Sequence, residues 1–138
     1  MVFWIYNNIQ NMNKIIYGLI GVVALAGIIW LVMTPGKPGK YDDFAKCIKD
    51  KEVKFYGAFW CQHCQAQKAR FGKSSKYLPY IECSTPDGKS QTQDCTDHGI
   101  TSYPTWFFPS GASSTPEKVT GEMELEDLAK RTSCTLPQ

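Results

Sequence analysis

The sequence predicts a small α/β domain with a central mixed sheet, preceded by an apolar helix long enough to cross a membrane. Residues 15–33 carry no charge, a Pro/Gly segment follows at residues 34–40, and strand-like and helix-like patterns alternate after it. At 138 residues the chain has room for one core after the apolar segment. We divide it into a lead (1–14), a transmembrane anchor (15–33), a linker (34–40) and one folded domain (41–138).

The apolar segment is the first predicted element. As a helix that rises about 1.5 Å per residue, residues 15–33 span about 28 Å, close to the hydrocarbon thickness of a bilayer. A cleaved secretory signal is the alternative, because Ala24 and Ala26 form a small-x-small site that a peptidase could cut. The apolar run continues beyond that site, which favours an uncleaved signal-anchor. The lead is interpreted as an interfacial segment or as an over-extended start before Met12.

Cysteine content indicates the compartment of the domain. All six cysteines follow the apolar segment, and an even number in a domain of this size is typical of an oxidising environment. Six reduced, buried thiols are the alternative. We therefore expect the domain on the extracytoplasmic side of the cell membrane, with the N-terminus inside. The net charge of only +2 argues against a nucleic-acid partner.

The first half of the domain predicts helix, strand and helix. Asp42 is suited to cap a short helix with one apolar face. Residues 53–59 alternate as a strand. A segment without Gly or Pro, residues 62–70, predicts the next helix, and Gly72 is its expected stop.

The second half predicts a strand at residues 80–83, a polar helix at 90–98 and an apolar strand at 105–108. A hairpin partner is expected at residues 118–120. The last element is an amphipathic helix that begins with a solvated acidic face and ends near Thr132.

A closely spaced cysteine pair lies where the first strand meets the following helix. Residues 60–64 read Trp-Cys-Gln-His-Cys, so Cys61 and Cys64 can form and break a disulfide within one helical turn. Backbone N–H groups and the helix dipole favour a thiolate at Cys61, and His63 adds a donor and, when protonated, a cation. Cys61 is therefore the expected nucleophile and the less exposed Cys64 the resolving thiol. Trp60 is expected to shield the sulfurs and contact substrate.

Two other functions are compatible with this pair of cysteines. One is a zinc site that adds two of His63, Cys83 and Cys95 as ligands. The spacing after the first pair is irregular for a zinc ribbon, so we expect no metal and no cofactor. The other is a non-catalytic adaptor, which would tolerate the change Cys61→Ser.

The motif and its surroundings resemble the thioredoxin superfamily. The stretch FYGAFWCQHCQAQKARFG, followed by LPYIECS and YPTW, is similar to the thioredoxin-like domain fused to bacterial vitamin K epoxide reductase homologues. The resemblance covers about residues 41–134 and implies a thioredoxin fold. It also implies a cis peptide between Tyr103 and Pro104 against the active-site sulfurs, with the Tyr103 backbone pairing with a substrate peptide.

The same resemblance bears on the remaining four cysteines. It implies a structural disulfide between Cys83 and Cys95, a bridge worth about 3 kcal/mol for a loop of this length. Cys47 and Cys134 are left over. This fold brings the ends of the first and last helices to one pole, so we expect a further bridge between them.

Two departures from reducing thioredoxins bear on the direction of the reaction. Phe55 stands where those proteins bear a buried aspartate, and Gln62-His63 replaces Gly-Pro in a manner that resembles oxidising DsbA proteins. We therefore expect a membrane-anchored thiol-disulfide oxidoreductase that oxidises secreted proteins. A quinone-linked membrane oxidase of the vitamin K epoxide reductase or DsbB kind would regenerate it. A reductase or isomerase is the alternative.

Overall fold

Two structural units make up the chain, and each is described by itself. The computed structural model describes residues 2–33, 36–112 and 114–138, including all of their side chains except those of residues 2–11 and 13. The units are Met1–Lys37 and Pro38–Gln138. The division falls inside the expected linker, of which Thr34 and Pro35 lie outside the described residues, as does Met1 of the lead.

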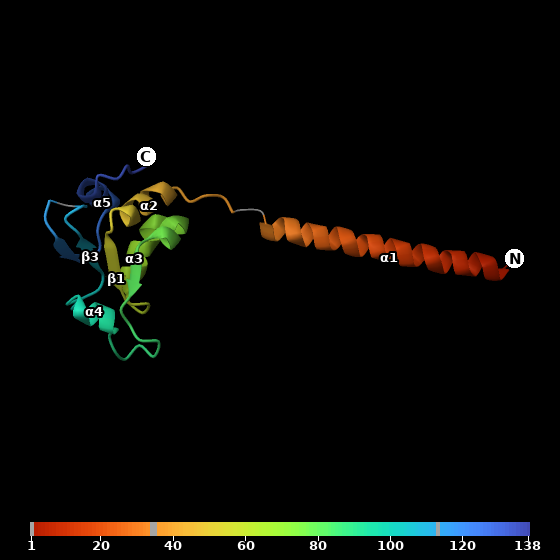
Figure 1. Cartoon of the computed structure of the whole chain (residues 1–138), viewed down its shortest axis with the longest axis horizontal. Helices are drawn as coiled ribbons and strands as arrows, with labels where there is room; N and C mark the ends of the chain where they lie inside the picture. The colour runs from red at the N-terminus through yellow and green to blue at the C-terminus, as the bar shows by residue number, and fades with distance from the viewer. Residues whose placement is uncertain (1, 34–35, 113) are drawn as a thin grey trace. The chain divides into compact units, whose positions relative to one another are not determined.

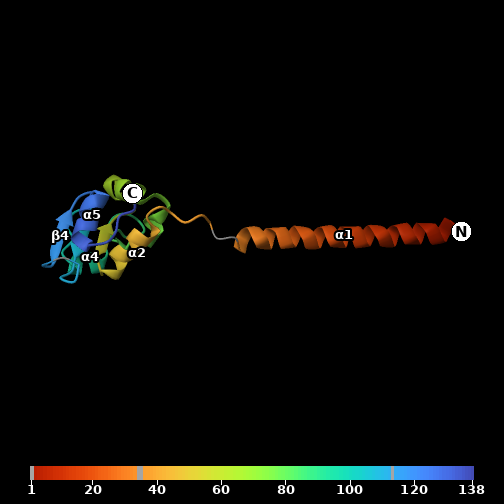
Figure 2. The ribbon, with the colours of Figure 1, turned by 90° about the horizontal axis from the view of Figure 1, so that it is seen from above.

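The first unit is one helix, α1 (Val2–Met33), an unbroken coil in Figures 1 and 2. It includes the backbone of the lead as well as the expected anchor. Among the described helices, only α1 contains a stretch long and apolar enough to cross a membrane, Lys14–Met33, with a mean hydropathy of 2.6. Its described side chains are exposed within the unit, as expected of a helix that has no protein core of its own to enter.

The second unit is built on a four-stranded mixed sheet in the order β2-β1-β3-β4. The strands are β1 (Lys54–Gly57), β2 (Tyr80–Glu82), β3 (Thr105–Phe108) and β4 (Glu117–Thr120). Strand β1 runs parallel to β2 and antiparallel to β3, and β3 pairs antiparallel with β4. The mixed sheet and all four strands match the prediction, with β1 and β2 shorter than expected at their ends.

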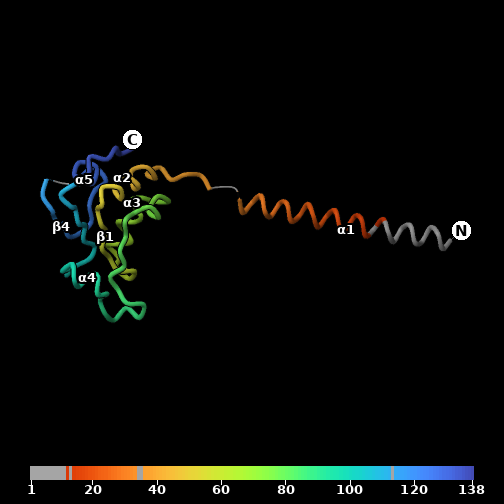
Figure 3. Tube along the Cα trace, viewed as in Figure 1, coloured from red at the N-terminus to blue at the C-terminus, as the bar shows by residue number. Residues whose placement is uncertain are grey.

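Helices cover both faces of this sheet. They are α2 (Asp42–Asp50), α3 (Gln62–Phe71), the 3₁₀ helix η1 (Gly72–Tyr77), α4 (Gln93–Asp97) and α5 (Leu125–Thr132). Neighbouring residues of a strand point to opposite faces, so Phe55 and Tyr56 enter different clusters. Phe55 joins the main core with α2, α3 and α5, whereas Tyr56 packs with Cys83, Cys95 and Ile100 beside α4. The chain trace in Figure 3 follows β1 directly into α3.

Two local predictions need correction. Asp42 does not cap α2, because the helix already begins at Asp42 and the preceding Tyr41 makes no side-chain cap bond. In the first turn the Asp42 carboxylate still interacts favourably with the helix dipole. The helix expected at residues 90–98 is only Gln93–Asp97, because Ser84 and Gln91 form a β-bridge just before it. As predicted, α3 ends at Gly72, and the chain then continues as η1.

Candidate active site

The turn between β1 and α3 places Cys61 at the N-cap of α3. The Cys61 backbone N–H donates to the carbonyl of Ala58 at 3.0 Å, which closes the turn. Cys61 is extended, and its Sγ accepts from the N–H of Cys64 at 3.3 Å. A thiol therefore occupies the position that Ser or Thr usually fills, against the unpaired N–H groups that favour negative charge.

Cys61 and Cys64 differ in exposure in the expected sense. Both carry free thiols. Cys61 keeps 7% of its surface accessible, whereas Cys64 has none. Burial raises the pKa of the Cys64 thiol to about 12, and the neighbouring Cys61 acts in the same direction. At neutral pH the buried sulfur is therefore a protonated thiol.

A pocket of about 500 Å³ opens at Cys61. It is lined by Trp60, Cys61, Gln62, His63 and Tyr103. Trp60 meets Tyr103 edge to face at 6.0 Å and donates its indole N–H to the Ser84 hydroxyl at 2.9 Å. Four of the residues singled out in the sequence thus lie together on one surface.

The peptide bond between Tyr103 and Pro104 is cis, the geometry that the resemblance implied. Pro104 is buried, whereas Tyr103 is half-buried and reaches the pocket. This step lies immediately before β3, whose first residue pairs with β1. Pro104 therefore lies just before β3, at the end of the sheet where β1 leads into the cysteine turn.

His63 contacts a carboxylate that sequence reasoning assigned to a solvated face. Its Nδ1 lies 2.8 Å from an oxygen of Glu122, and Arg70 donates to the other oxygen of Glu122 at 3.2 Å. Arg70 also donates to Glu124 at 2.5 Å. These partners hold the pKa of Glu122 below its ordinary value, His63 having the larger effect. The charge of a protonated His63 is therefore balanced by a carboxylate next to it.

Gln67 explains why Glu122 lies beside α3. Its side chain is fully buried, donates to the Met123 carbonyl at 3.0 Å and accepts from the Met123 N–H at 2.6 Å. A polar residue such as Gln67 on the inner face of the predicted helix indicates a buried hydrogen bond. The sequence does not show the partner, because Met123 is 56 residues away. The pair fastens the segment before α5 to the active-site helix.

A second group of polar side chains surrounds Cys64. The Tyr80 hydroxyl donates to Glu82 at 2.8 Å, and the Lys68 Nζ lies 3.2 Å from the centre of the Tyr80 ring. Burial raises the pKa of Tyr80, with Glu82 acting in the same direction, and burial lowers the pKa of Lys68. Phe55, in contrast, stacks on Trp106 at 4.4 Å. Ionisable groups near Cys64 thus come from α3 and β2.

The other four cysteines form two disulfides. Cys83 is bonded to Cys95, with an S–S distance of 1.99 Å, and joins the end of β2 to α4. Cys47 is bonded to Cys134 at 2.02 Å and joins α2 to the residues after α5. Because the sulfurs of Cys83 and Cys95 are bonded to each other, they are not available as thiolate ligands for the alternative zinc site.

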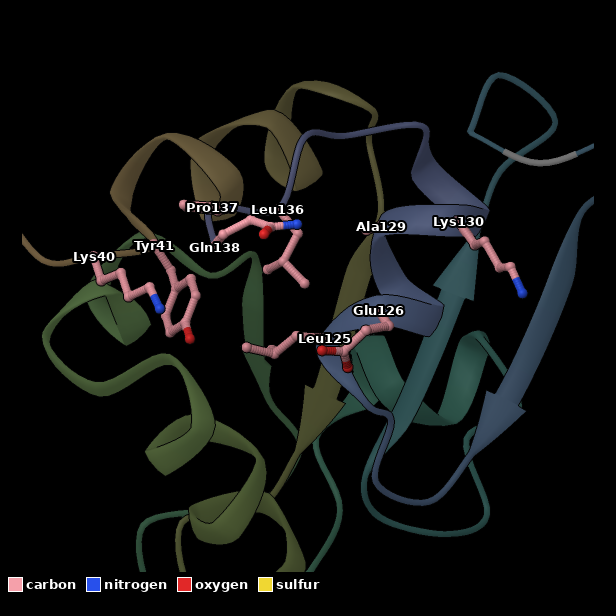
Figure 4. Close-up of a pocket in the computed structure, with 9 residues that line it drawn as sticks. All are labelled: Lys40, Tyr41, Leu125, Glu126, Ala129, Lys130, Leu136, Pro137 and Gln138. Carbon is pink, nitrogen blue, oxygen red and sulfur yellow. The ribbon is translucent and has the colours of Figure 1, made fainter.

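Another pocket, of about 540 Å³, lies over α5 and the residues at the C-terminal end (Figure 4). Its lining includes Lys40, Tyr41, Leu125 and Leu136. None of its lining residues is a cysteine or belongs to the turn at Cys61. This second pocket therefore offers no thiol.

Comparison with known proteins agrees with this geometry. The family model described as thioredoxin matches residues 38–133. A protein named thiol-disulfide oxidoreductase LTO1, from Arabidopsis thaliana, is 39% identical over 99 residues, which are 68% of this chain and 24% of that protein. Proteins named protein disulfide-isomerase A2, from Pongo abelii and Homo sapiens, are 36% and 35% identical over 83 residues.

These matches cover only a part of each relative. Each of the two isomerase matches covers 56% of this chain and 16% of the relative. The chain thus spans about a quarter or less of the length of these curated relatives. The matched region contains the sheet, the cysteine turn and the cis proline, and on this ground the chain belongs to the thioredoxin family.

Proposed function

We propose that the chain is a thiol-disulfide oxidoreductase whose redox centre is the pair Cys61 and Cys64. The observation that carries the proposal is the division of the six cysteines. Four are bonded in disulfides, whereas these two carry free thiols at the start of α3, beside an open pocket. The printed names of the relatives, thiol-disulfide oxidoreductase and protein disulfide-isomerase, support the same chemistry.

The reaction is an exchange between this pair and two cysteines of a substrate. A substrate thiolate attacks Sγ of Cys61 in the Cys61–Cys64 disulfide, and Cys64 leaves as a thiolate. The second substrate thiol then attacks the mixed disulfide, so that the substrate is oxidised and Cys61 is released reduced. The reverse sequence begins with attack by Cys61, the more exposed of the two sulfurs.

Substrates of this site are polypeptides with cysteine pairs. The pocket at Cys61 is open and lined by the rings of Trp60 and Tyr103, and Trp60 is 54% exposed. Such a surface suits an extended peptide whose cysteine reaches Cys61 while its neighbours contact Trp60 and Tyr103. Pro104, which is buried, would hold the Tyr103 backbone in place for this contact. No cofactor takes part in the exchange itself.

Membrane anchoring by α1, with the domain on the extracytoplasmic side of the cell membrane, completes the proposal. The stretch Lys14–Met33 has the length and composition of a membrane span, although a signal sequence would share both properties. The two disulfides support an oxidising compartment. We infer that α1 is an uncleaved anchor which holds the domain near secreted substrates.

The proposed direction is oxidation, with regeneration by a quinone-linked membrane oxidase of the vitamin K epoxide reductase or DsbB kind. Gln62-His63 between the cysteines and Phe55 in place of an acid favour this direction. A reductase or isomerase is the second candidate, and the names of the isomerase relatives speak for it. The two directions use the same sulfurs.

Trapping of a mixed disulfide tests the proposed centre. The full chain carrying Cys64→Ala is expected to form a covalent adduct with an unfolded protein that contains disulfides. Dithiothreitol is expected to release the adduct. Cys61→Ala is the matched control and is expected to form none. Equal adducts from both variants would contradict the role of Cys61, and absence of adducts and of disulfide transfer from every form of the chain would favour a non-catalytic adaptor. Reoxidation of the wild-type chain by membranes that contain a quinone-linked oxidase tests the partner.

A further inference from the structure

The sulfur of Cys64 and the ring of Tyr80 both lie beside Gly57 of β1. A β-carbon on Gly57 would lie 2.8 Å from Sγ of Cys64 and 2.9 Å from Cε2 of Tyr80. The sulfur and the edge of the ring thus border the same small space. Lys68 follows Cys64 by four residues on α3, the spacing at which side chains of a helix are neighbours. Its Nζ lies over the Tyr80 ring at 3.2 Å.

Exchange at Cys64 requires a partner for its proton. The thiol is buried and its pKa is raised to about 12, so a free thiolate is costly in this place. Phe55 occupies β1 next to it and offers only an aromatic ring. Apart from Cys61, the ionisable groups that interact with Cys64 among the described residues lie on α3 and β2.

Tyr80 and Glu82 are occupied by other bonds. The Tyr80 hydroxyl donates to Glu82, and burial raises the pKa of that phenol, so it keeps its proton. Besides Tyr80, the carboxylate of Glu82 accepts from the N–H groups of Phe59 at 3.2 Å and Ser84 at 2.9 Å. Glu82 thus ties β2 to the turn that carries the cysteines, which makes it a positioning residue.

Lys68 has the properties that the exchange needs. Burial lowers the pKa of its amine, while Glu82 and Cys64 act in the opposite direction, and Lys68 in turn favours the thiolate of Cys64. The ionisable groups that face it are Cys64 on its own helix and Tyr80 and Glu82 on β2. An ammonium next to the leaving sulfur can give up a proton more readily than an exposed lysine can.

We propose that Lys68 exchanges a proton with Cys64 whenever the Cys61–Cys64 disulfide is opened or closed, a role that rests on the proposed function. On opening, a substrate thiolate bonds to Cys61 and the bond between the two cysteine sulfurs breaks. Cys64 receives the electron pair, takes a proton from the Lys68 ammonium and becomes a thiol. Lys68 is left as an amine and regains a proton from water. On closing, Lys68 first loses a proton to water and the amine then takes the proton of Cys64. The Cys64 thiolate attacks Sγ of Cys61 in the mixed disulfide, and the substrate sulfur leaves as a thiolate.

The rate at which glutathione opens the Cys61–Cys64 disulfide tests this role. The full oxidised chain is mixed with glutathione, and the change in tryptophan fluorescence is followed as a function of pH, with each rate divided by the glutathione thiolate concentration. Lys68→Met is expected to slow opening about 100-fold near neutral pH. The gap is expected to narrow as the pH rises, because burial lowers the pKa of the wild-type amine and it loses its proton before an ordinary lysine does. Lys73→Met, a change at an exposed lysine just beyond α3, is the control and is expected to match the wild type.

Each result decides between the proposals. A gap that stays constant with pH would mean that Lys68 only supports the packing around Cys64, and a wild-type rate in Lys68→Met would exclude any role. Lys68→Gln, which keeps a polar side chain, repeats the test if the methionine variant unfolds. If glutathione fails to open the disulfide in the wild-type chain, the proposed function itself is wrong, whatever the variants do.

Discussion

Gly57 and Cys64 are in such close contact that a β-carbon on Gly57 would lie 2.8 Å from the Cys64 sulfur. The same carbon would lie 2.9 Å from the ring of Tyr80. Neither neighbour is the free end of a long side chain, so one of them would have to move. Glycine at the end of β1 is therefore required by the position of the Cys64 sulfur.

We predict that Gly57→Ala displaces Cys64 and lowers the free energy of unfolding by about 1 to 3 kcal/mol, as overpacking of a core does. Closure of the disulfide by Cys64 is expected to slow as well. Denaturant unfolding and the rate of release of a trapped mixed disulfide measure the two effects. Gly111→Ala is the control, because a β-carbon there has nothing within 4 Å. Equal behaviour of the two variants would contradict the predicted crowding.

Gln67→Leu is predicted to destabilise the domain by about 2 to 4 kcal/mol, because it leaves the N–H and the carbonyl of Met123 without their buried partner. Denaturant unfolding measures the loss. Gln65→Leu is the control on the same helix, since its bond to the carbonyl of Phe59 is exposed and water can replace it. If both variants lose the same amount, burial of the Gln67 bonds is not what stabilises this contact.

Removal of the two disulfides is predicted to have unequal effects. The bridge between Cys47 and Cys134 closes a separation of 87 residues and the one between Cys83 and Cys95 only 12. In the chain-entropy model these loops correspond to about 4.5 and about 3 kcal/mol. Paired alanine variants, compared by denaturant unfolding of the full chain, test the order. A larger loss from the short loop would show that local packing, and not loop length, dominates.

Glu122 is predicted to make stability depend on pH at the acidic end. Its pKa is lowered in the folded chain by His63 and Arg70, from an ordinary value near 4.5. The stabilisation is therefore present above that value and is lost as the pH falls through the lowered one. Glu122→Gln is expected to reduce stability near neutral pH and to behave like the wild type in stronger acid. Unfolding at a series of pH values measures the difference. A constant difference at all pH values would contradict the ion pair.

Local patterns were sufficient to predict most of the fold. Alternation predicted the strands, and the absence of Gly and Pro after Cys61 predicted α3, which ends at the expected Gly72. Turn chemistry was harder to predict. The chain turns into η1 after Gly72, and a β-bridge between Ser84 and Gln91 shortens the helix that follows. Polar segments of this kind have no period that separates helix from turn.

The supporting contacts of the site could not be predicted, because they join distant segments. Glu122 meets His63 across 59 residues, and Gln67 meets Met123 across 56. In the sequence, Glu122 is one of several acids near a helix start, and nothing marks it as a partner of His63. The position of Lys68 over the ring of Tyr80 could not be predicted either, because the two residues belong to α3 and β2.

The reduction potential of the Cys61–Cys64 pair tests the central proposal most directly. The full chain is equilibrated with glutathione buffers of known ratio, and the oxidised fraction of the pair is measured. A protein that oxidises secreted substrates is predicted to have a potential near about −120 mV, as DsbA does. A potential near about −270 mV, the value typical of thioredoxin, would contradict that direction and favour a reductant.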